Sequence, residues 1–269
     1  MIRESRPVRL GLRTLVVVYL ALLVLVPIVM VVINTFSGGL TNLATAFSSP
    51  AVTTALRLTG IVTFWSVVLN LVFGVGISLL LVRYDFAGKR LLSALVDLPL
   101  SVSPVVVGLA LMLVYRRDAP VGSFLYSIGY QIIFATPGLV LATVFVAFPL
   151  VVREIVPVLT ELGDEQEQAA RSLGGNGWQV FWRITLPSIK WAVVYGIVLA
   201  LARSLGEFGA VKVVSGNIAL RTQTATLVVE ETYGNFQEGT AYAVAFLLTA
   251  AAVACITFVS VVRPKEARS

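Results

Sequence analysis

Long apolar runs separated by short polar stretches extend along the whole chain. A membrane-spanning helix needs about 20 mostly apolar residues, and six runs reach that length. We predict spans at Leu15–Ile33, Leu58–Val82, Leu91–Tyr115, Ile132–Val152, Ile189–Val211 and Ala241–Val262. The pattern therefore predicts an all-α membrane protein with six transmembrane helices.

The first apolar run follows several arginines, as the core of a cleavable signal peptide also does. This run is longer than a usual signal core, however, and no A-x-A-like cleavage site follows it. We therefore interpret Leu15–Ile33 as a retained span.

Composition supports the membrane class and excludes several kinds of chemistry. Only 13% of the 269 residues are charged, whereas soluble domains have about 25%. The chain has no histidine and a single cysteine, Cys255, which argues against disulfide frameworks, Cys/His zinc sites and histidine-based catalysis. The sequence also lacks the G-x-x-x-x-G-K-[ST] loop that holds ATP phosphates. We expect no catalytic residue, no metal and no cofactor on this chain.

Lysine and arginine residues gather on alternate polar stretches and predict the orientation, because they concentrate in cytoplasmic loops. The N-terminal segment, the turn at 83–90, the block at 153–190 and the C-terminal end hold 14 of the 20 basic residues. The intervening loops hold Arg116, Arg117, Lys212 and Arg221. We therefore expect both termini and the 153–190 block to be cytoplasmic. This bias also explains the net charge of +6, so the charge gives no support to nucleic-acid binding.

The longest polar segment between two predicted spans is Gly163–Pro187. Asp164 and Glu167 have the spacing of an N-cap residue and its capping-box partner, so we expect a short helix to begin there. Gly174 and Gly175 should end it, as glycines often end helices.

A second helical turn should follow, because Trp178, Phe181 and Trp182 have i, i+3, i+4 spacing. Leu186-Pro187 should stop it, since a residue before proline avoids the helical conformation. Two interpretations remain open: a docking element for a soluble partner, or an amphipathic loop on the lipid surface, where Trp is common. The acidic first half suits an anionic inner leaflet poorly and favours docking.

The same segment resembles the EAA loop of binding-protein-dependent ABC importer permeases, which reads E-A-A, three residues, G, nine residues, I-x-L-P. The matching residues are Gln168, Ala169, Ala170, Gly174, Ile184, Leu186 and Pro187. One position departs from the pattern, because Gln168 stands where the family usually has Glu, and Glu167 is its neighbour. The resemblance implies that Gly163–Pro187 is a coupling helix, to which we also assign Asp164 and Glu167, and that it inserts into a groove of an ATPase subunit.

Three further runs resemble the sulfate/thiosulfate importer permeases, in particular the second permease of the pair, the CysW type. They are Asp97–Tyr115, Phe134–Leu159 and Ala202–Ile218, and the similarity extends over about residues 55–260. Molybdate and tungstate permeases share the G-E-F-G-A part, so these anions remain an alternative. An ion-driven secondary anion transporter is the alternative from a different class.

Charged residues inside a span are functional hypotheses by default, and the fifth predicted span holds Arg203 and Glu207. Their i, i+4 spacing puts them on one helix face, where they can pair. We consider a self-neutralising structural pair and a part of the anion path as alternatives. Together with Gly206, Phe208 and Gly209, these two residues form a candidate gate on the translocation path. Gly206 and Gly209 flank Glu207 and Phe208, and glycines allow another backbone to approach closely.

Ser101, Ser103 and Pro104 interrupt the third predicted span. A proline there kinks the helix and frees a carbonyl. Ser101 and Ser103 could meet an anion beside this break, or the kink could serve packing alone.

The resemblance implies a type I ABC importer permease fold in a bacterial inner membrane. We divide the chain into an N-terminal segment with the first span and an outer loop (1–51), a permease core (52–263) containing the coupling loop (163–187), and a cytoplasmic tail (264–269). The implied partners are an ABC ATPase dimer that carries ATP-Mg, a homologous second permease in a heterodimer, an extracytoplasmic sulfate-binding protein, and membrane lipids.

Overall fold

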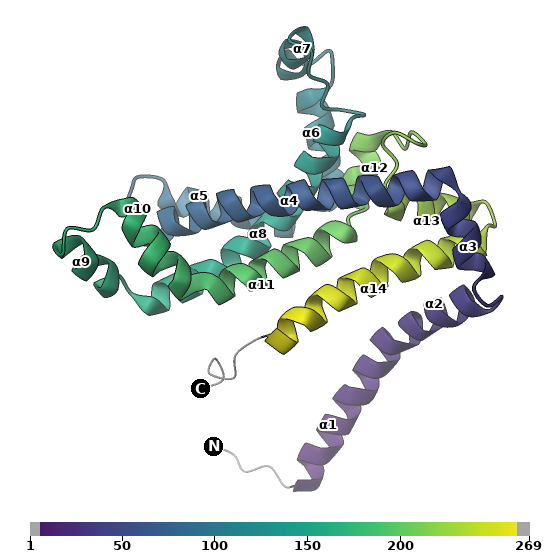
Figure 1. The fold of residues 1–269 in the computed structure, drawn as a ribbon, viewed down its shortest axis with the longest axis horizontal. Coiled ribbons are helices and arrows are strands. Elements are labelled where there is room, and N and C mark those ends of the chain that lie inside the picture. Colours follow the sequence, from purple (N-terminus) through teal and green to yellow (C-terminus); the bar gives the residue numbers. More distant parts are fainter. Residues whose placement is uncertain (1–5, 263–269) are drawn as a thin grey trace.

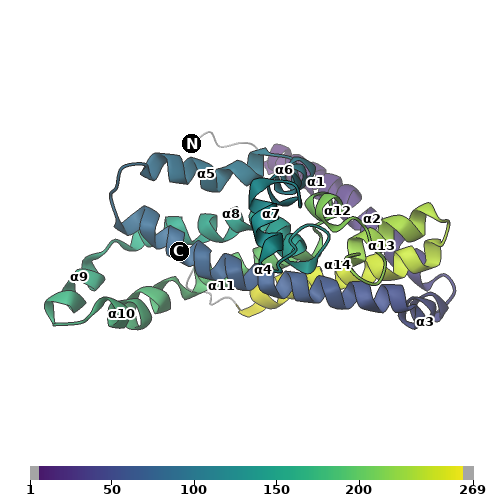
Figure 2. The same ribbon diagram turned by 90° about the horizontal axis from the view of Figure 1, so that it is seen from above.

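The computed structural model describes residues 6–262, and every regular element in that range is a helix. The long helices α4 (Pro50–Arg83), α8 (Thr136–Leu162), α11 (Leu186–Leu205) and α14 (Glu238–Val262) form the bundle in Figure 1. Short helices α3 (Thr41–Ser48), α12 (Gly209–Ser215) and α13 (Ala225–Gly234) lie toward one end of the long axis, and α9 (Glu165–Ser172) and α10 (Gly177–Val180) form the other (Figure 2). Residues 1–5 and 263–269, with Arg3, Arg263, Lys265, Arg268 and the expected tail 264–269, lie outside the described range.

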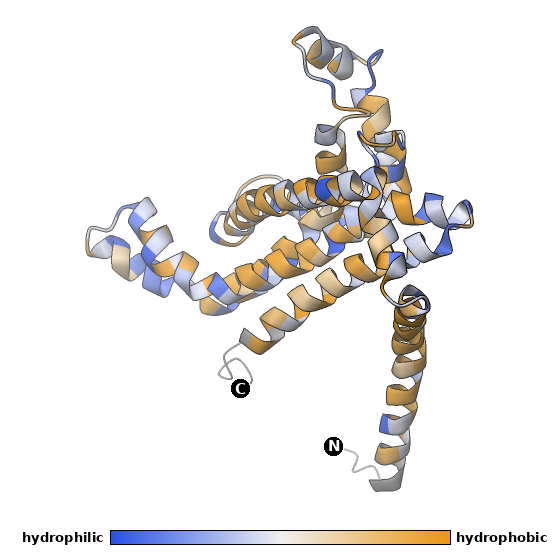
Figure 3. Cartoon of the chain, turned by 45° about the vertical axis from the view of Figure 1, so that its right-hand side comes forward, coloured by the Kyte–Doolittle hydropathy of each residue, from blue (hydrophilic) through white to orange (hydrophobic). Residues whose placement is uncertain are grey.

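Five helices in the described part are long and apolar enough to cross a membrane, and one bent pair would make a sixth. The five are Leu10–Phe36, Pro50–Arg83, Thr136–Leu162, Gly177–Leu205 and Glu238–Val259. In Figure 3 most residues along these helices are coloured hydrophobic, and hydrophilic residues gather toward the ends of the bundle. The number reaches the six predicted spans when the bent pair is counted as one span, and the ends of the helices differ from those of the predicted runs.

The third predicted span, Leu91–Tyr115, is wrong as a single helix. It consists of α5 (Lys89–Ser101) and α6 (Pro104–Tyr115), whose axes differ in direction by 115°. Ser103 before the proline is extended, with φ −59° and ψ 135°, as the clash with a following proline ring requires. The expected kink is therefore a complete break, and α6 leads away from the bundle to α7 (Pro120–Ser127) (Figure 1).

The fifth predicted span, Ile189–Val211, is wrong at both ends. At one end, α11 stops at Leu205, the chain leaves the helix at Gly206 and Phe208, and α12 begins at Gly209. At the other end, the helix does not stop before Pro187. A π-helical turn, η2 (Phe181–Thr185), joins α10 to α11 without a gap. The wider turn before Pro187 relieves the clash that a proline ring makes with the preceding turn.

The bundle core is packed around Val151 of α8. A Cβ on Gly74 of α4 would lie 2.7 Å from Val151 Cγ1, and a Cβ on Gly196 of α11 would lie 3.1 Å from Val151 Cα. Both neighbours are therefore glycines because only glycine lets the helices approach this closely. The contact holds α4, α8 and α11 together and fixes where their ends emerge.

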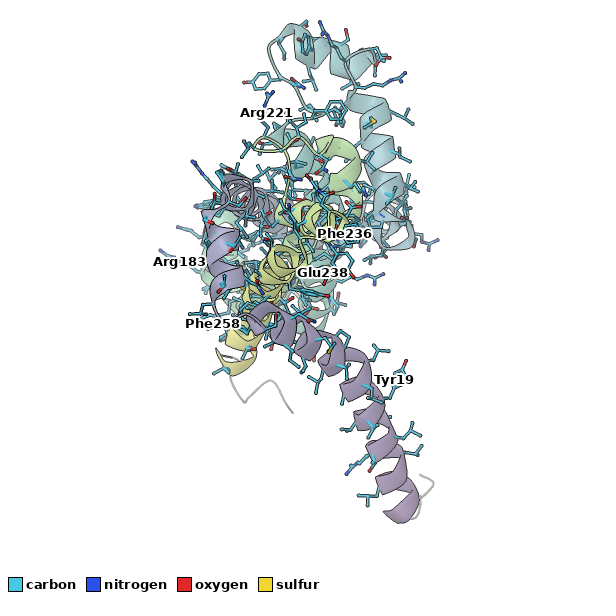
Figure 4. All side chains as sticks on the ribbon, turned by 90° about the vertical axis from the view of Figure 1, so that its right-hand side faces the viewer. Tyr19, Arg183, Arg221, Phe236, Glu238 and Phe258 are labelled. Atoms are coloured by element: carbon cyan, nitrogen blue, oxygen red, sulfur yellow. The ribbon has the colours of Figure 1, made fainter. Side chains whose placement is uncertain are left out.

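The N-terminal helical run stands apart from this bundle. It comprises α1 (Arg6–Leu20), the π turn η1 (Ala21–Leu25) and α2 (Val26–Phe36). In Figure 4, Tyr19 lies on the part of this helical run that extends away from the bundle. The α2 end of the run is attached to α14, because Thr35 Oγ1 donates to the Tyr242 carbonyl at 2.9 Å. In Figure 4, Glu238 and Phe258 mark the two ends of α14, the helix that α2 contacts.

Candidate functional site

The EAA-like segment forms a helical hairpin beyond the ends of α4, α8 and α11 (Figures 1 and 2). Helix α9 ends at Ser172, and Gly174 adopts a φ of +87°, an angle that residues other than glycine rarely adopt. The N–H groups of Gly174 and Gly175 donate to the carbonyls of Arg171 and Ala170, each at 3.0 Å. The predicted glycine stop is confirmed.

The predicted capping box at the start of α9 is wrong. Asp164 occupies the N-cap position, but its side chain makes no capping hydrogen bond and accepts instead from Gln168 Nε2 at 2.8 Å. Glu167 turns toward the bundle. The capping box lies one helix later, where Asn176 Oδ1 accepts from the Gln179 N–H and Gln179 Oε1 accepts from the Asn176 N–H. The N-x-x-Q spacing could have revealed it.

The hairpin and the η2 turn that follows it present apolar side chains at the tip, on α10 and on η2. Leu173 is 89% exposed, Trp178 70% and Trp182 48%. The Trp178 and Trp182 rings pack edge to face with centroids 5.5 Å apart. A groove of about 290 Å³ separates α9 from α10, and Ala170, Leu173, Gln179 and Arg183 line part of it. Exposed large side chains around a groove, surrounded by polar residues, are typical of a docking surface.

The remaining motif residues divide between solvent and core. Gln168 and Ala169 are exposed, and Ala170 and Ile184 are half-buried. Leu186 packs against the core shared by α4, α8 and α11, and Pro187 follows it on the surface.

Glu167 is buried, and sequence reasoning did not find its partner. Its Oε2 lies 3.1 Å from Arg83 Nε, and its Oε1 accepts from Thr185 Oγ1 at 2.9 Å. Nearby, Lys89 donates to Asp85 at 2.7 Å, and this contact lowers the pKa of the exposed Asp85 carboxyl. The end of the bundle that carries the hairpin is thus rich in paired charges.

The second group of candidate residues lies at two helix breaks that pack together. A Cβ on Gly108 of α6 would lie 2.7 Å from the Ala210 carbonyl oxygen of α12, and a Cβ on Gly209 would lie 3.1 Å from Pro104 Cβ. The structure therefore brings the region of Ser101 and Ser103, which are both exposed, next to the Gly206–Gly209 break. Gly206 itself has no close neighbour of this kind.

Glu207 lies in the second break and is 3% exposed. Its Oε1 accepts from the Ala210 N–H at 2.9 Å, and its carbonyl accepts from Thr226 Oγ1 at 2.9 Å. Its Oε2 lies 2.7 Å from Arg203 Nη1, in an ion pair that is not aligned as a hydrogen bond. The predicted pairing is confirmed, although Glu207 follows the end of α11 and does not share its helix with Arg203.

Comparison with known proteins identifies related chains. Residues 70–265 match the family model of the binding-protein-dependent transport system inner membrane component. The sulfate transport system permease protein CysW of Synechococcus elongatus is 46% identical over 92% of this chain and 87% of the relative. In Escherichia coli strain K12, CysW is 40% identical over 93% of this chain and 87% of its own, and CysT is 32% identical over 93% and 90%.

The fold also resembles that of solved proteins. Crystal structures of a bacterial ABC transporter that imports alginate, one of them with an alginate-bound periplasmic protein, align with a TM-score of 0.78. The alignments cover 94% of this chain and 93% or 92% of the other, at 15% and 14% identity. At that identity the likeness shows a shared fold.

Proposed function

Because this chain belongs to the family of binding-protein-dependent transport system inner membrane components, we propose that it is the permease subunit of an ATP-driven importer of sulfate or thiosulfate. It is a multi-pass membrane protein with the fold of ABC importer permeases. The observation that carries the proposal is the α9–α10 hairpin. Its exposed apolar side chains lie within the EAA-like segment, in a chain that is similar to sulfate permeases, and this supports a docking role.

The hairpin is the docking site for an ATPase subunit on the cytoplasmic side of a bacterial inner membrane. Leu173 and Trp178 are its exposed apolar anchors, and anchors of this kind supply much of the binding energy at interfaces. The basic residues at the same end of the bundle, Arg83, Arg153 and Arg183 among them, support a cytoplasmic orientation. Both chain termini belong to this side, and residues 52–263 form the transport core.

A homologous second permease completes the transport unit, and likeness to both CysW and CysT supports a heterodimer. An extracytoplasmic sulfate-binding protein delivers the anion, and an ATPase dimer with ATP-Mg supplies the energy. Closure of that dimer pushes the two coupling helices together, the bundles rotate as rigid bodies, and the path opens outward. This is alternating access of the kind known for other transporters.

The paired helix breaks are the proposed gate on this path. Ser101 and Ser103 supply hydroxyls beside it, and Gly206, Phe208 and Gly209 form its backbone. Glu207 neutralises Arg203 in the present state, so the arginine stabilises the gate rather than holding a dianion.

The experiment that tests this function is an ATPase assay of the complex purified through this chain. Sulfate, thiosulfate, molybdate and tungstate are each supplied with a cognate binding protein. Stimulation by the sulfur oxyanions alone supports the proposal, whereas stimulation by molybdate or tungstate keeps the importer and overturns its substrate. Transport without any co-purified ATPase would indicate an ion-driven carrier.

Removal of Asp164–Leu173 provides the matching test of docking. The deletion should abolish co-purification of the ATPase and leave the spans inserted in the membrane. An ATPase that co-purifies normally with the deleted chain contradicts the assigned role of the hairpin.

A further inference from the structure

Arg83 is the last residue of α4 and the centre of a contact network at the base of the hairpin. Its Nε donates to Glu167 Oε2 at 3.1 Å, its Nη1 to the Leu159 carbonyl at 3.0 Å, and its Nη2 to the Gly163 carbonyl at 2.7 Å. All three nitrogens of the guanidinium are thus used, each toward a different acceptor. Lysine could not reproduce this, because its single ammonium has no fork of fixed geometry.

The three acceptors lie at the junction between the hairpin and the bundle, through which any movement of the hairpin must pass to reach the spanning helices. Leu159 and Gly163 lie at the end of α8, where the last carbonyls of a helix lack partners within the helix. Glu167 lies in the first turn of α9. Arg83 therefore connects α4, the end of α8 and the start of α9 through one side chain.

Glu167 extends the network to the helix that follows the hairpin. Its second oxygen accepts from Thr185 Oγ1, at the end of the π turn η2. Single π turns inside α-helices occur frequently at functional sites. The side chains of Arg83 and Glu167 are only 13% and 9% exposed, and the cavity beside them is about 20 Å³, room for about one water molecule. The two paired side chains are therefore mostly shielded from solvent, whereas the bond to the Gly163 carbonyl lies at the surface.

We propose that Arg83 is a positioning residue that transmits movement of the docked α9–α10 hairpin to the spanning helices α4 and α8. The inference rests on the proposed function, because movement of the hairpin has a meaning only when an ATPase docks on it. The docking surface and the link are separate. Leu173 and Trp178 point into solvent, whereas Arg83 and Glu167 are covered by the protein. Loss of the link should leave docking intact and disconnect ATP hydrolysis from transport.

The test compares Arg83→Met, Glu167→Leu and the double variant with Arg153→Met as the matched control. Arg153 pairs with Asp97 at 3.0 Å, but these side chains are 60% and 48% exposed and lie outside the hairpin. Two readouts are needed. Hydrogen exchange of α9 is measured on the chain alone in lipid nanodiscs, and sulfate transported per ATP hydrolysed is measured on the complex in liposomes.

Arg83→Met should accelerate exchange in α9 and lower the sulfate transported per ATP by about tenfold, within the usual range of coupling between sites, while the ATPase still co-purifies. Arg153→Met should change neither readout. The double variant removes both charges of the pair, so it should regain part of the thermal stability lost in Arg83→Met but keep the low transport per ATP. That combination separates a positioning role from a merely structural one.

Unchanged α9 exchange and unchanged coupling in Arg83→Met would overturn the proposal. So would a double variant whose coupling returns to the wild-type value. If the wild-type chain captures no ATPase, the proposed function fails, and the exchange readout still decides whether Arg83 holds α9 in place.

Discussion

Two neighbouring residues show how one position along a helix changes the role of a side chain. Gln168 and Glu167 are 100° apart on an α-helix. Gln168 therefore faces solvent and bonds Asp164, whereas Glu167 faces the bundle and pairs with Arg83. The sequence located the motif, but it could not tell which of the two side chains is buried, because that depends on where α4 ends in space.

Leu173 offers the simplest residue-level test of docking. We expect Leu173→Asp to weaken ATPase binding by about tenfold or more, because an exposed apolar anchor is replaced by a charge. Thermal stability should not change, since the residue is 89% exposed. Titration of the purified ATPase against the chain in nanodiscs measures the effect. Phe236→Asp is the control, because Phe236 is equally exposed but lies beside α13 and α14, away from the hairpin. Equal affinities of the two variants would contradict the docking role.

The ion pair between Arg203 and Glu207 allows a test of how much a charge contact within the bundle contributes to stability. Glu207→Gln keeps an acceptor for the Ala210 N–H but leaves Arg203 without a countercharge. We expect the free energy of unfolding to fall by about 2 kcal/mol, less than for a fully buried pair because the Arg203 side chain is 35% exposed. This corresponds to a fall in Tm of about 5 °C, measured in detergent micelles. Glu230→Gln breaks the exposed pair with Lys212 and should lower the free energy of unfolding by no more than about 1 kcal/mol. Similar losses of stability in Glu207→Gln and Glu230→Gln would contradict the expectation that the pair within the bundle contributes more than the exposed pair.

At the scale of elements, hydropathy predicted the third and fifth spans as continuous helices, but both are broken in the structure. A proline and two serines are visible in the third run, so a local disturbance at Ser101–Pro104 was expected. The direction change of 115° was not, because it follows from packing of α6 against α12. In the fifth run, Gly206 and Phe208 are compatible with a helix in the sequence, and only the dihedral angles show that α11 ends before them.

Gly108 tests whether contact between the two breaks matters. In Gly108→Ala, the new Cβ would lie 2.7 Å from the Ala210 carbonyl oxygen, so α6 and α12 must separate. We expect a loss of about 1–3 kcal/mol, typical of overpacking, together with slower transport. Gly76→Ala is the control on α4, because its Cβ meets no atom within 4 Å and alanine favours a helix. Thermal unfolding and sulfate uptake measure both variants. Unaltered uptake in a correctly folded Gly108→Ala chain would show that the contact between α6 and α12 is not needed for the proposed gate to work.

At the scale of the whole molecule, the sequence predicted the fold class and the polar end of the bundle but not the arrangement of the helices. Charge bias and hydropathy are properties of single segments, and they carry no information on which helices touch. The neighbours α4 and α11 meet on Val151 only because two distant glycines, Gly74 and Gly196, face it from either side. Such a three-way contact can be recognised only in space.

The proposed orientation in the membrane rests on the charge bias alone, and it yields the last prediction. With Cys255 replaced by Ser, a single cysteine at Ser172 on the hairpin should react with an impermeant maleimide only in inside-out vesicles. A cysteine at Gln237, before α14 at the other end of the bundle, should react only in intact spheroplasts. Both positions are exposed, so a lack of reaction reports sidedness rather than burial. Labelling in the reverse pattern would put the hairpin outside the cell, where no ATPase can dock, and would refute the proposed function together with the orientation.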